Sequence, residues 1–167
     1  MFDKTSKIKV SIIIPTLNEV KNIKILIPYL FKHGGTALTE IIVVDAFKSK
    51  DGTAEVAAQL GATVIKSKQC CRAVQLNEGA AYARSALLYF VHADVLPPTT
   101  YLSDLQHAIE AGKQWGFFSY RFKKPHTLLK INAYYTRFDG LFAGGGDQTL
   151  FILKSAFDEL GGFDESY

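Results

Sequence analysis

Runs of apolar residues recur along the first half of the chain, and each is followed by a polar or helix-forming stretch. The runs at residues 9–14, 40–44, 62–65 and 86–91 are apolar or β-branched, which predicts strands, the last of them buried on both faces. The stretches at about 19–31, 52–60 and 72–83 predict helices. A β-α-β order of this kind implies right-handed crossovers and an α/β fold, with helices on both faces of a mostly parallel central sheet.

The second half continues the pattern less regularly. Pro97-Pro98 interrupts the chain, a helix is predicted to run from there to about residue 112, and residues 117–122 predict a strand. An aromatic-rich helix is predicted at 128–138, a glycine-rich loop at 140–147, a strand at 149–153 and a helix at 154–160. The sequence contains no internal repeat and no linker, so all 167 residues are expected to form a single domain.

Composition narrows the class of protein. The chain is 48% hydrophobic and 21% charged, as in ordinary globular domains, and its formal net charge is only +3. The lysines are spread along the chain rather than gathered in a basic stripe, which argues against a nucleic-acid partner. No run is long enough for a membrane span, and the basic N-terminus lacks an apolar signal region, so a cytoplasmic location is expected. The adjacent Cys70 and Cys71 are interpreted as reduced thiols.

Polar side chains gather where the predicted strands end. His92-Ala93-Asp94 closes the buried run 86–91, Asp45 ends the second strand, and Thr16 follows the first. Because the carboxyl ends of parallel strands share one edge of a sheet, we expect these side chains to lie near one another, where α/β folds bind ligands. Carboxylates at such an edge suit a base or ribose and a divalent cation held with substrate phosphates. The competing interpretation is local capping, for which Asn18 and Asp51 are good candidates.

Several nucleotide and hydrolase classes are excluded by missing motifs. A dinucleotide-binding unit requires G-x-G-x-x-G after its first strand, where this chain has Pro15-Thr16-Leu17-Asn18-Glu19. A phosphate-binding P-loop and the G-x-S-x-G elbow of serine hydrolases are also absent.

Five segments, in order, resemble the family 2 glycosyltransferases, which are nucleotide-sugar enzymes with the GT-A fold. They are VSIIIPTLNE at 10–19, IIVVD at 41–45 leading to Asp51-Gly52-Thr53, RAVQLNEGA at 72–80, His92-Ala93-Asp94, and GGFDE at 161–165. The resemblance covers essentially the whole chain. It implies a GT-A-type, Rossmann-like domain.

The resemblance also implies roles for individual residues on the donor side. Pro15, Thr16 and Glu19 would line the nucleoside pocket, and Asp45 would hydrogen-bond the base. Asp51 would lie near the ribose or the diphosphate. The expected donor is a nucleotide-diphosphate sugar, in particular a UDP-sugar.

The remaining roles concern the diphosphate and the transfer step. Arg72 would lie close to the diphosphate, where a guanidinium suits bidentate contact. Asp94, with His92, would bind Mn²⁺ or Mg²⁺, and the metal would neutralise the departing nucleoside diphosphate. An acceptor hydroxyl would attack the anomeric carbon with inversion after a carboxylate takes its proton. Asp147 is the candidate acceptor-side carboxylate, with a turn aspartate as its alternative.

The chain departs from the family pattern in three places. His92 stands where the metal motif commonly has aspartate, and imidazole cannot accept hydrogen bonds as a carboxylate does. The loop at 46–50 is longer than usual, so Phe47 would crowd the pocket and Lys48 and Lys50 would add positive charge. The chain ends at Tyr167, before the Glu-Asp motif that would hold the catalytic base. We therefore expect a domain truncated at its acceptor-side end.

Two other functions remain open. A non-catalytic nucleotide-sugar binding module would account for the missing base and the altered loop. A sugar-phosphate nucleotidyltransferase shares the α/β layout but needs a glycine-rich, basic loop after the first strand, which Leu17-Asn18-Glu19 does not supply. The aromatic positions between 128 and 142 are interpreted first as core; a groove for a lipid-linked acceptor at a membrane surface, or a homodimer contact, are the alternatives. These positions are Tyr134, Tyr135, Phe138 and Phe142.

Overall fold

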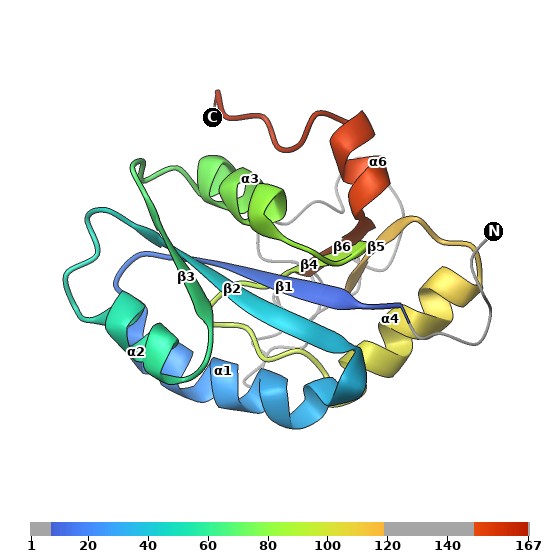
Figure 1. The fold of residues 1–167 in the computed structure, drawn as a ribbon, viewed down its shortest axis with the longest axis horizontal. Coiled ribbons are helices and arrows are strands. Elements are labelled where there is room, and N and C mark those ends of the chain that lie inside the picture. The colour runs from blue at the N-terminus through green and yellow to red at the C-terminus, as the bar shows by residue number, and fades with distance from the viewer. Residues whose placement is uncertain (1–7, 119–148, 167) are drawn as a thin grey trace, which may run out of the picture.

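One sheet of six strands, in the order β3-β2-β1-β4-β6-β5, organises the part of the chain that the structure describes (Figure 1). The structure is a computed structural model, and it describes residues 8–118 and 149–166. β1 pairs in parallel with β2 on one side and β4 on the other, β2 pairs in parallel with β3, and β6 runs antiparallel to both of its neighbours. The strands are β1 (Val10–Thr16), β2 (Leu38–Ala46), β3 (Thr63–Ser67), β4 (Leu87–Phe90), β5 (Trp115–Phe118) and β6 (Thr149–Leu153).

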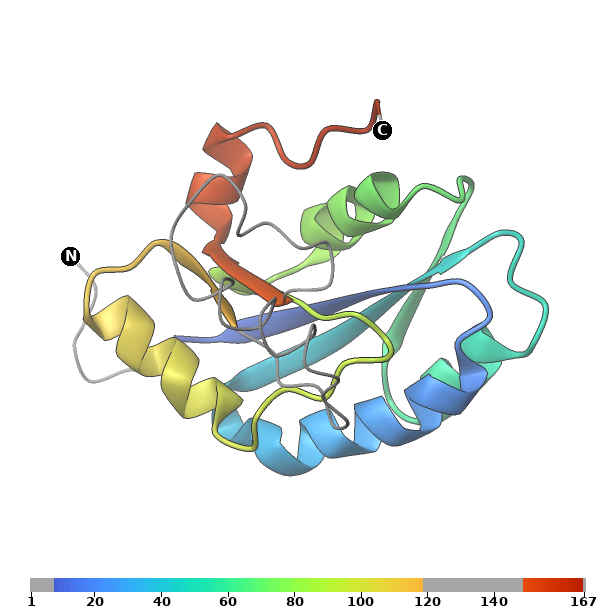
Figure 2. The same cartoon turned by 180° about the vertical axis from the view of Figure 1, so that it is seen from behind.

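Helices cover both faces of this sheet. Figures 1 and 2 show α1, α2 and α4 beneath the sheet and α3 and α6 above it. A short 3₁₀ turn, η1, follows α1 and leads into β2. The helical bounds are α1 (Val20–Gly34), η1 (Gly35–Ala37), α2 (Thr53–Gln59), α3 (Arg72–Tyr82), α4 (Tyr101–Glu110) and α6 (Lys154–Glu159). The predicted α/β class and the predicted mostly parallel sheet are confirmed.

The predicted elements agree with the structure apart from their ends. The strand expected at 117–122 begins earlier, as β5, and the residues after 118 lie outside the described part of the chain. The described part of the chain also leaves out the aromatic helix expected at 128–138 and the loop expected at 140–147. The lipid-acceptor and dimer hypotheses, which rest on that helix, therefore stay predictions. Cys70 is exposed and Cys71 is half-buried, and neither forms a disulfide bond in the structure.

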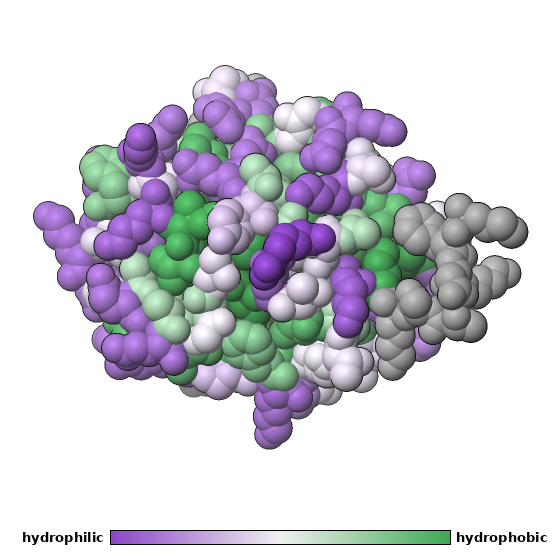
Figure 3. All heavy atoms as spheres, viewed as in Figure 1, coloured by the Kyte–Doolittle hydropathy of each residue, from purple (hydrophilic) through white to green (hydrophobic). Residues whose placement is uncertain are grey.

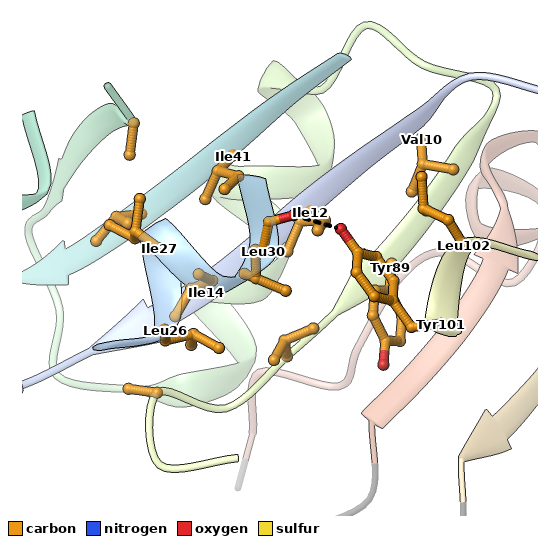
Figure 4. Close-up of a cluster of buried hydrophobic side chains, with 14 of the residues drawn as sticks. Val10, Ile12, Ile14, Leu26, Ile27, Leu30, Ile41, Tyr89, Tyr101 and Leu102 are labelled. Atoms are coloured by element: carbon orange, nitrogen blue, oxygen red, sulfur yellow. Dashed lines mark hydrogen bonds between the residues drawn. The ribbon is translucent and has the colours of Figure 1, made fainter. Parts of the chain in front are cut away.

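The core has two parts because β1 is covered on both faces. Ile12 and Ile14 point toward α1 and α4, where they meet a large cluster with Leu26 and Leu30 (Figure 4). Ile13, between them in sequence, points to the other face and packs with residues of α3 and α6. All seven residues of β1 are buried. Each large aliphatic side chain buried in this way contributes about 1.5–3 kcal/mol of hydrophobic free energy.

Two buried tyrosines join four elements. The rings of Tyr89 in β4 and Tyr101 in α4 are stacked, with centroids 5.9 Å apart, as Figure 4 shows. The Tyr101 hydroxyl donates to the carbonyl of Leu30 at 2.9 Å, and the Tyr89 hydroxyl donates to Oγ1 of Thr149 at 3.1 Å. Burial raises the pKa of both phenols, so both remain neutral hydrogen-bond donors. The pair therefore fixes α4 to α1 and β4 to β6.

Gly79 lets α3 approach the sheet closely. A Cβ atom at this position would lie 2.4 Å from Cγ2 of Ile13 and 3.1 Å from Cγ2 of Val44. Any side chain would push the helix away from β1 and β2. The depth at which α3 lies on the sheet is thus set by this glycine.

The surface is mixed in character. On the face shown in Figure 3, hydrophilic side chains project around the rim and apolar ones lie between them. Among the described residues, no helix combines the length and the hydropathy that crossing a membrane requires.

A buried carboxylate holds the starting ends of the strands together. Glu40 in β2 is 6% exposed, and its Oε1 accepts from the hydroxyl of Ser11 at 2.7 Å and from the backbone N–H of Arg84 at 2.9 Å. Its Oε2 accepts from Nε and Nη2 of Arg84. The backbone N–H of Ser85 in turn donates to Oγ of Ser11. Burial alone would raise the pKa of Glu40, but these hydrogen bonds and the arginine charge hold it below its ordinary value.

The Glu40→Gln variant is expected to lose about 1–3 kcal/mol of unfolding free energy at pH 7, because the Arg84 and Ser11 donors lose a charged acceptor. The matched control is Glu55→Gln, whose ion pair with Lys66 is solvent-exposed and should contribute less than about 1 kcal/mol. Since the folded-state pKa of Glu40 is lowered, its contribution is present above the unfolded pKa and disappears as pH falls through the folded pKa. Urea titrations at pH 7 and below about pH 4 measure this; an equal deficit at both pH values would contradict the assignment.

Candidate functional site

The loops that follow the parallel strands leave the sheet from one edge. Figure 1 shows the β1–α1, β2–α2 and β3–α3 loops together on the left, and Figure 2 shows them on the right from behind. β4 is parallel to β1, and the backbone N–H of Val91 donates to the carbonyl of Ile13, so the segment carrying His92 and Asp94 leaves in the same direction. The expected shared edge for the polar residues after β1, β2 and β4 is therefore confirmed.

Thr16 and Asp45 form a buried polar pair at this edge. They lie opposite each other in the β1–β2 register, and Oγ1 of Thr16 donates to Oδ1 of Asp45 at 2.8 Å. Asp45 is 4% exposed. Burial raises its pKa above the ordinary value, and the hydrogen bonds from Thr16 and Ser49 only partly offset this. A carboxylate with a raised pKa at a ligand-binding edge is a typical feature of a functional site.

A side chain from α3 forms hydrogen bonds with the backbone of both strands at this pair. Nε2 of Gln75 donates to the carbonyl of Val44 at 2.7 Å and to the carbonyl of Thr16 at 2.9 Å. Gln75 is 5% exposed, so both bonds are shielded from water. Val44 immediately precedes Asp45, so one amide group holds the backbone of both strands at the buried pair.

The β1–α1 and β2–α2 loops are tied together through Asn18. The backbone N–H of Asn18 donates to Oγ of Ser49, and Oδ1 of Asn18 accepts from the N–H of Lys50 at 2.8 Å. Asn18 has a φ of 57°, in the left-handed region that asparagine tolerates better than most residues. The prediction that Asn18 caps α1 is wrong, because its side chain bonds the neighbouring loop instead.

Asp51 provides the capping interaction in its place. Its Oδ2 accepts from the N–H of Val20, the first residue of α1, and its Oδ1 accepts from the N–H and the hydroxyl of Thr53, the first residue of α2. Oγ1 of Thr53 also accepts from the N–H of Glu19. Burial is the largest single influence and raises the pKa of Asp51, but these hydrogen bonds together lower it below its ordinary value. The contacts match the capping interpretation, while a role near the ribose or diphosphate stays a prediction.

The other residues expected to contact the nucleoside lie around the same loops. Pro15 is buried within β1. Glu19 is half-buried at the N-cap of α1, where its Oε2 accepts from Nδ2 of Asn22 at 2.7 Å. Arg72 is exposed at the first residue of α3. Glu19 and Arg72 therefore lie at the starts of the helices that follow β1 and β3, and their roles in binding a nucleotide stay predictions.

His92 and Asp94 lie in a turn closed by the bond from the N–H of Val95 to the carbonyl of His92. Asp94 is exposed and His92 is half-buried. The hydroxyl of Tyr29 in α1 donates to the carbonyl of Pro97, which anchors the segment beyond the turn. Within residues 8–118 and 149–166, no group of three histidine, cysteine, aspartate or glutamate side chains is arranged to hold a metal. A cation at Asp94 would therefore need oxygens from the substrate, as Mg²⁺ and Mn²⁺ sites on diphosphates have.

Asn77 connects α3 to the C-terminal segment. Its Nδ2 donates to the carbonyl of Phe163 at 2.9 Å and to Oε1 of Glu165 at 2.8 Å, and its Oδ1 accepts from the N–H of Phe163. Gly162 has a φ of 80°, and a Cβ there would lie 2.8 Å from Oδ1 of Asn77. Two side chains of α3, those of Gln75 and Asn77, thus bond the ends of β1 and β2 and the C-terminal segment.

A family model described as glycosyl transferase family 2 matches residues 11–153. The chain belongs to this family. The match confirms the resemblance seen in the sequence motifs.

Solved structures of similar fold include a mannosyltransferase and two sugar-phosphoglycerate synthases. A mannosyltransferase from Pyrobaculum calidifontis in complex with GDP-Man and Mn²⁺ has a TM-score of 0.73 and 21% identity, over 98% of this chain and 50% of its own. Mannosyl-3-phosphoglycerate synthase from Rubrobacter xylanophilus has a TM-score of 0.68 and 22% identity, over 90% and 55%. Glucosyl-3-phosphoglycerate synthase from Mycobacterium tuberculosis, in complex with Mn²⁺, UDP and glucosyl-3-phosphoglycerate, has a TM-score of 0.68 and 18% identity. The match covers 89% of this chain and 57% of that protein's chain. The chain spans about half the length of each of these proteins.

Sequence reasoning missed Gln75 and Asn77 as individual residues. Both stand in the stretch 72–80 that resembles the family, but only Arg72 was assigned a role there. Gln75 could have been found from the sequence as an uncharged polar residue on the sheet-facing side of an alanine-rich helix. Asp147, the expected acceptor-side carboxylate, lies outside the described residues and stays a prediction.

The Asp45→Asn variant is expected to melt a few degrees higher than the wild type at pH 7 in the absence of ligand. The raised folded-state pKa means that ionising Asp45 costs stability, a cost that appears as pH rises through that pKa and that asparagine avoids. Thermal unfolding at pH 7 and near pH 3.5 measures the gap, which should shrink at the lower pH. Asp158→Asn, at an exposed position of α6, serves as the control. A lower melting temperature for Asp45→Asn at pH 7 would mean that the carboxylate stabilises the fold.

Proposed function

We propose that this family 2 glycosyltransferase transfers a sugar from a UDP-sugar to a hydroxyl acceptor, with inversion and with the help of a divalent cation. The observation that carries the proposal is the buried Thr16–Asp45 pair, which shares one sheet edge with the turn holding Asp94. The Thr16–Asp45 pair supplies a hydrogen-bond acceptor for a nucleobase. The turn supplies the carboxylate of Asp94 for a metal bound to phosphates. The mannosyl and glucosyl transferases of similar fold support the general chemistry.

Asp45 has room for a further hydrogen bond from uracil, the base that the resemblance to the family implies. Two hydroxyls, those of Thr16 and Ser49, already donate to its carboxylate. A carboxylate has about four lone-pair sites, so Asp45 can also accept from the N3–H of uracil. An ionised carboxylate is a stronger acceptor than a protonated one, so nucleotide affinity should fall as pH drops through the raised pKa of Asp45.

The diphosphate would bind between α3 and the turn after β4. Arg72 carries its guanidinium at the start of α3, where the helix dipole also favours negative charge. Asp94 makes no hydrogen bond or ion pair with other described residues, and His92 lies two residues before it; together they would hold Mn²⁺ or Mg²⁺ with phosphate oxygens. When bound, the cation neutralises charge on the departing diphosphate.

The transfer step forms one bond and breaks one. The acceptor oxygen attacks the anomeric carbon from the face opposite the diphosphate, the bond from that carbon to the diphosphate oxygen breaks, and the hydroxyl proton passes to a carboxylate. Asp147 is our proposed candidate for this carboxylate. Attack from the opposite face inverts the configuration at the anomeric carbon.

Calorimetry with UDP and Mn²⁺ tests the donor site. The wild type is expected to bind UDP more tightly than GDP, and Asp94→Ala should lose at least about tenfold in affinity for UDP with Mn²⁺, since a metal ligand is removed. Asp158→Ala is the control, because its carboxylate is exposed on α6. An absence of binding by the wild type, or unchanged binding by Asp94→Ala, would overturn the metal-nucleotide proposal. Tighter binding of GDP would overturn the choice of base.

A second measurement separates an enzyme from a binding module. The protein is incubated with a UDP-sugar and Mn²⁺, and release of UDP is followed with and without small hydroxyl acceptors. The proposal expects UDP release that depends on Mn²⁺ and stops in Asp94→Ala. Tight binding with no release by the chain would favour the non-catalytic module.

A further inference from the structure

Gln75 is a buried polar residue whose hydrogen bonds all point to one place. Its Nε2 donates both protons, one to the carbonyl of Val44 at 2.7 Å and one to the carbonyl of Thr16 at 2.9 Å. The bonds run from α3 to two different strands and span 31 and 59 residues of sequence. A core position on a helix does not require a side-chain donor. The role of Gln75 is therefore to be sought in the two carbonyls that it bonds.

The two carbonyls lie at neighbouring positions of the β1–β2 register, close to the point where both strands end. Buried carbonyls must be satisfied, and an unpaired one costs about 1–3 kcal/mol. Gln75 therefore bonds the backbone of both strands to α3 at the point where β1 and β2 approach the ligand-binding edge.

The residues held in this way belong to the Thr16–Asp45 pair, which is called the base-binding pair because of its role in the proposed function. Thr16 accepts from Gln75 through its carbonyl and donates to Asp45 through its hydroxyl. Val44, the other acceptor, is covalently joined to Asp45. The reach of Gln75 depends on the close approach of α3, which Gly79 permits one turn later by leaving no Cβ against Ile13 and Val44.

We propose that Gln75 is a positioning residue for the nucleobase subsite: it fixes the separation of Thr16 and Asp45 without contacting the nucleotide. The proposal rests on the proposed function, because it concerns the same donor site. It makes α3 responsible for the geometry at the base as well as for Arg72 at the diphosphate, since Arg72 lies three residues before Gln75 on the same helix.

The test compares Gln75→Met with Asn77→Met. Both changes remove an amide of α3 that bonds backbone carbonyls, but Asn77 holds Phe163 and Glu165 rather than the base-binding pair. We expect Gln75→Met to weaken UDP binding by roughly tenfold or more, equivalent to about 1.4 kcal/mol, while its affinity for pyrophosphate with Mn²⁺ stays that of the wild type. Asn77→Met should leave both affinities unchanged even where its melting temperature falls.

The pH profile supplies a second readout. Gln75→Glu keeps the side-chain length and adds a carboxylate near Asp45, so the midpoint for loss of UDP binding on acidification should move to higher pH. This variant also carries the test if Gln75→Met does not fold. Equal losses of UDP and pyrophosphate affinity in Gln75→Met, or an unmoved pH midpoint in Gln75→Glu, would overturn the positioning role. Failure of the wild type to bind either UDP or GDP would instead count against the proposed function.

Discussion

The parallel pairing of β1 on both of its sides is the constraint from which the rest of the structure follows. A strand buried on both faces and flanked by parallel neighbours forces each connection to cross the sheet, which is why helices occupy both faces. The same pairing brings the ends of β1, β2 and β4 to one edge. Polar residues that are far apart in sequence, such as Thr16, Asp45 and Asp94, thereby come to share a surface that no single segment could build.

Helix α3 is the second organising element, because it carries contacts of three kinds. Gly79 sets its depth, Gln75 reaches the strand ends, and Asn77 holds the C-terminal segment. Arg72 begins the same helix at the exposed edge. One helix therefore contacts the ends of β1 and β2 and the C-terminal segment through different side chains.

The architecture could be predicted from the sequence because β1, β2 and β4 are uninterrupted apolar runs, whose burial dominates every alternative. The shared edge followed from that prediction, and so did the candidate Asp45. Side-chain partners could not be predicted in the same way. Asn18 and Asp51 are both good caps by residue type, and only the folded arrangement of two loops decides that Asp51 caps α1 while Asn18 bonds Lys50. Gln75 was missed because its acceptors lie on strands 31 and 59 residues away.

The polar groups at opposite ends of β1 and β2 have a consequence for folding. At the starting end, Glu40 accepts from Ser11, and at the finishing end Thr16 donates to Asp45. The strands between are a uniform apolar stretch, in which neighbouring alignments would bury similar hydrophobic area. A slip of one residue would turn Glu40 and Asp45 away from their donors at both ends at once. The two carboxylates therefore favour the native register of β1 and β2 over slipped alignments. This matters in a parallel sheet, because non-local strand pairing makes folding slow and prone to misassembly.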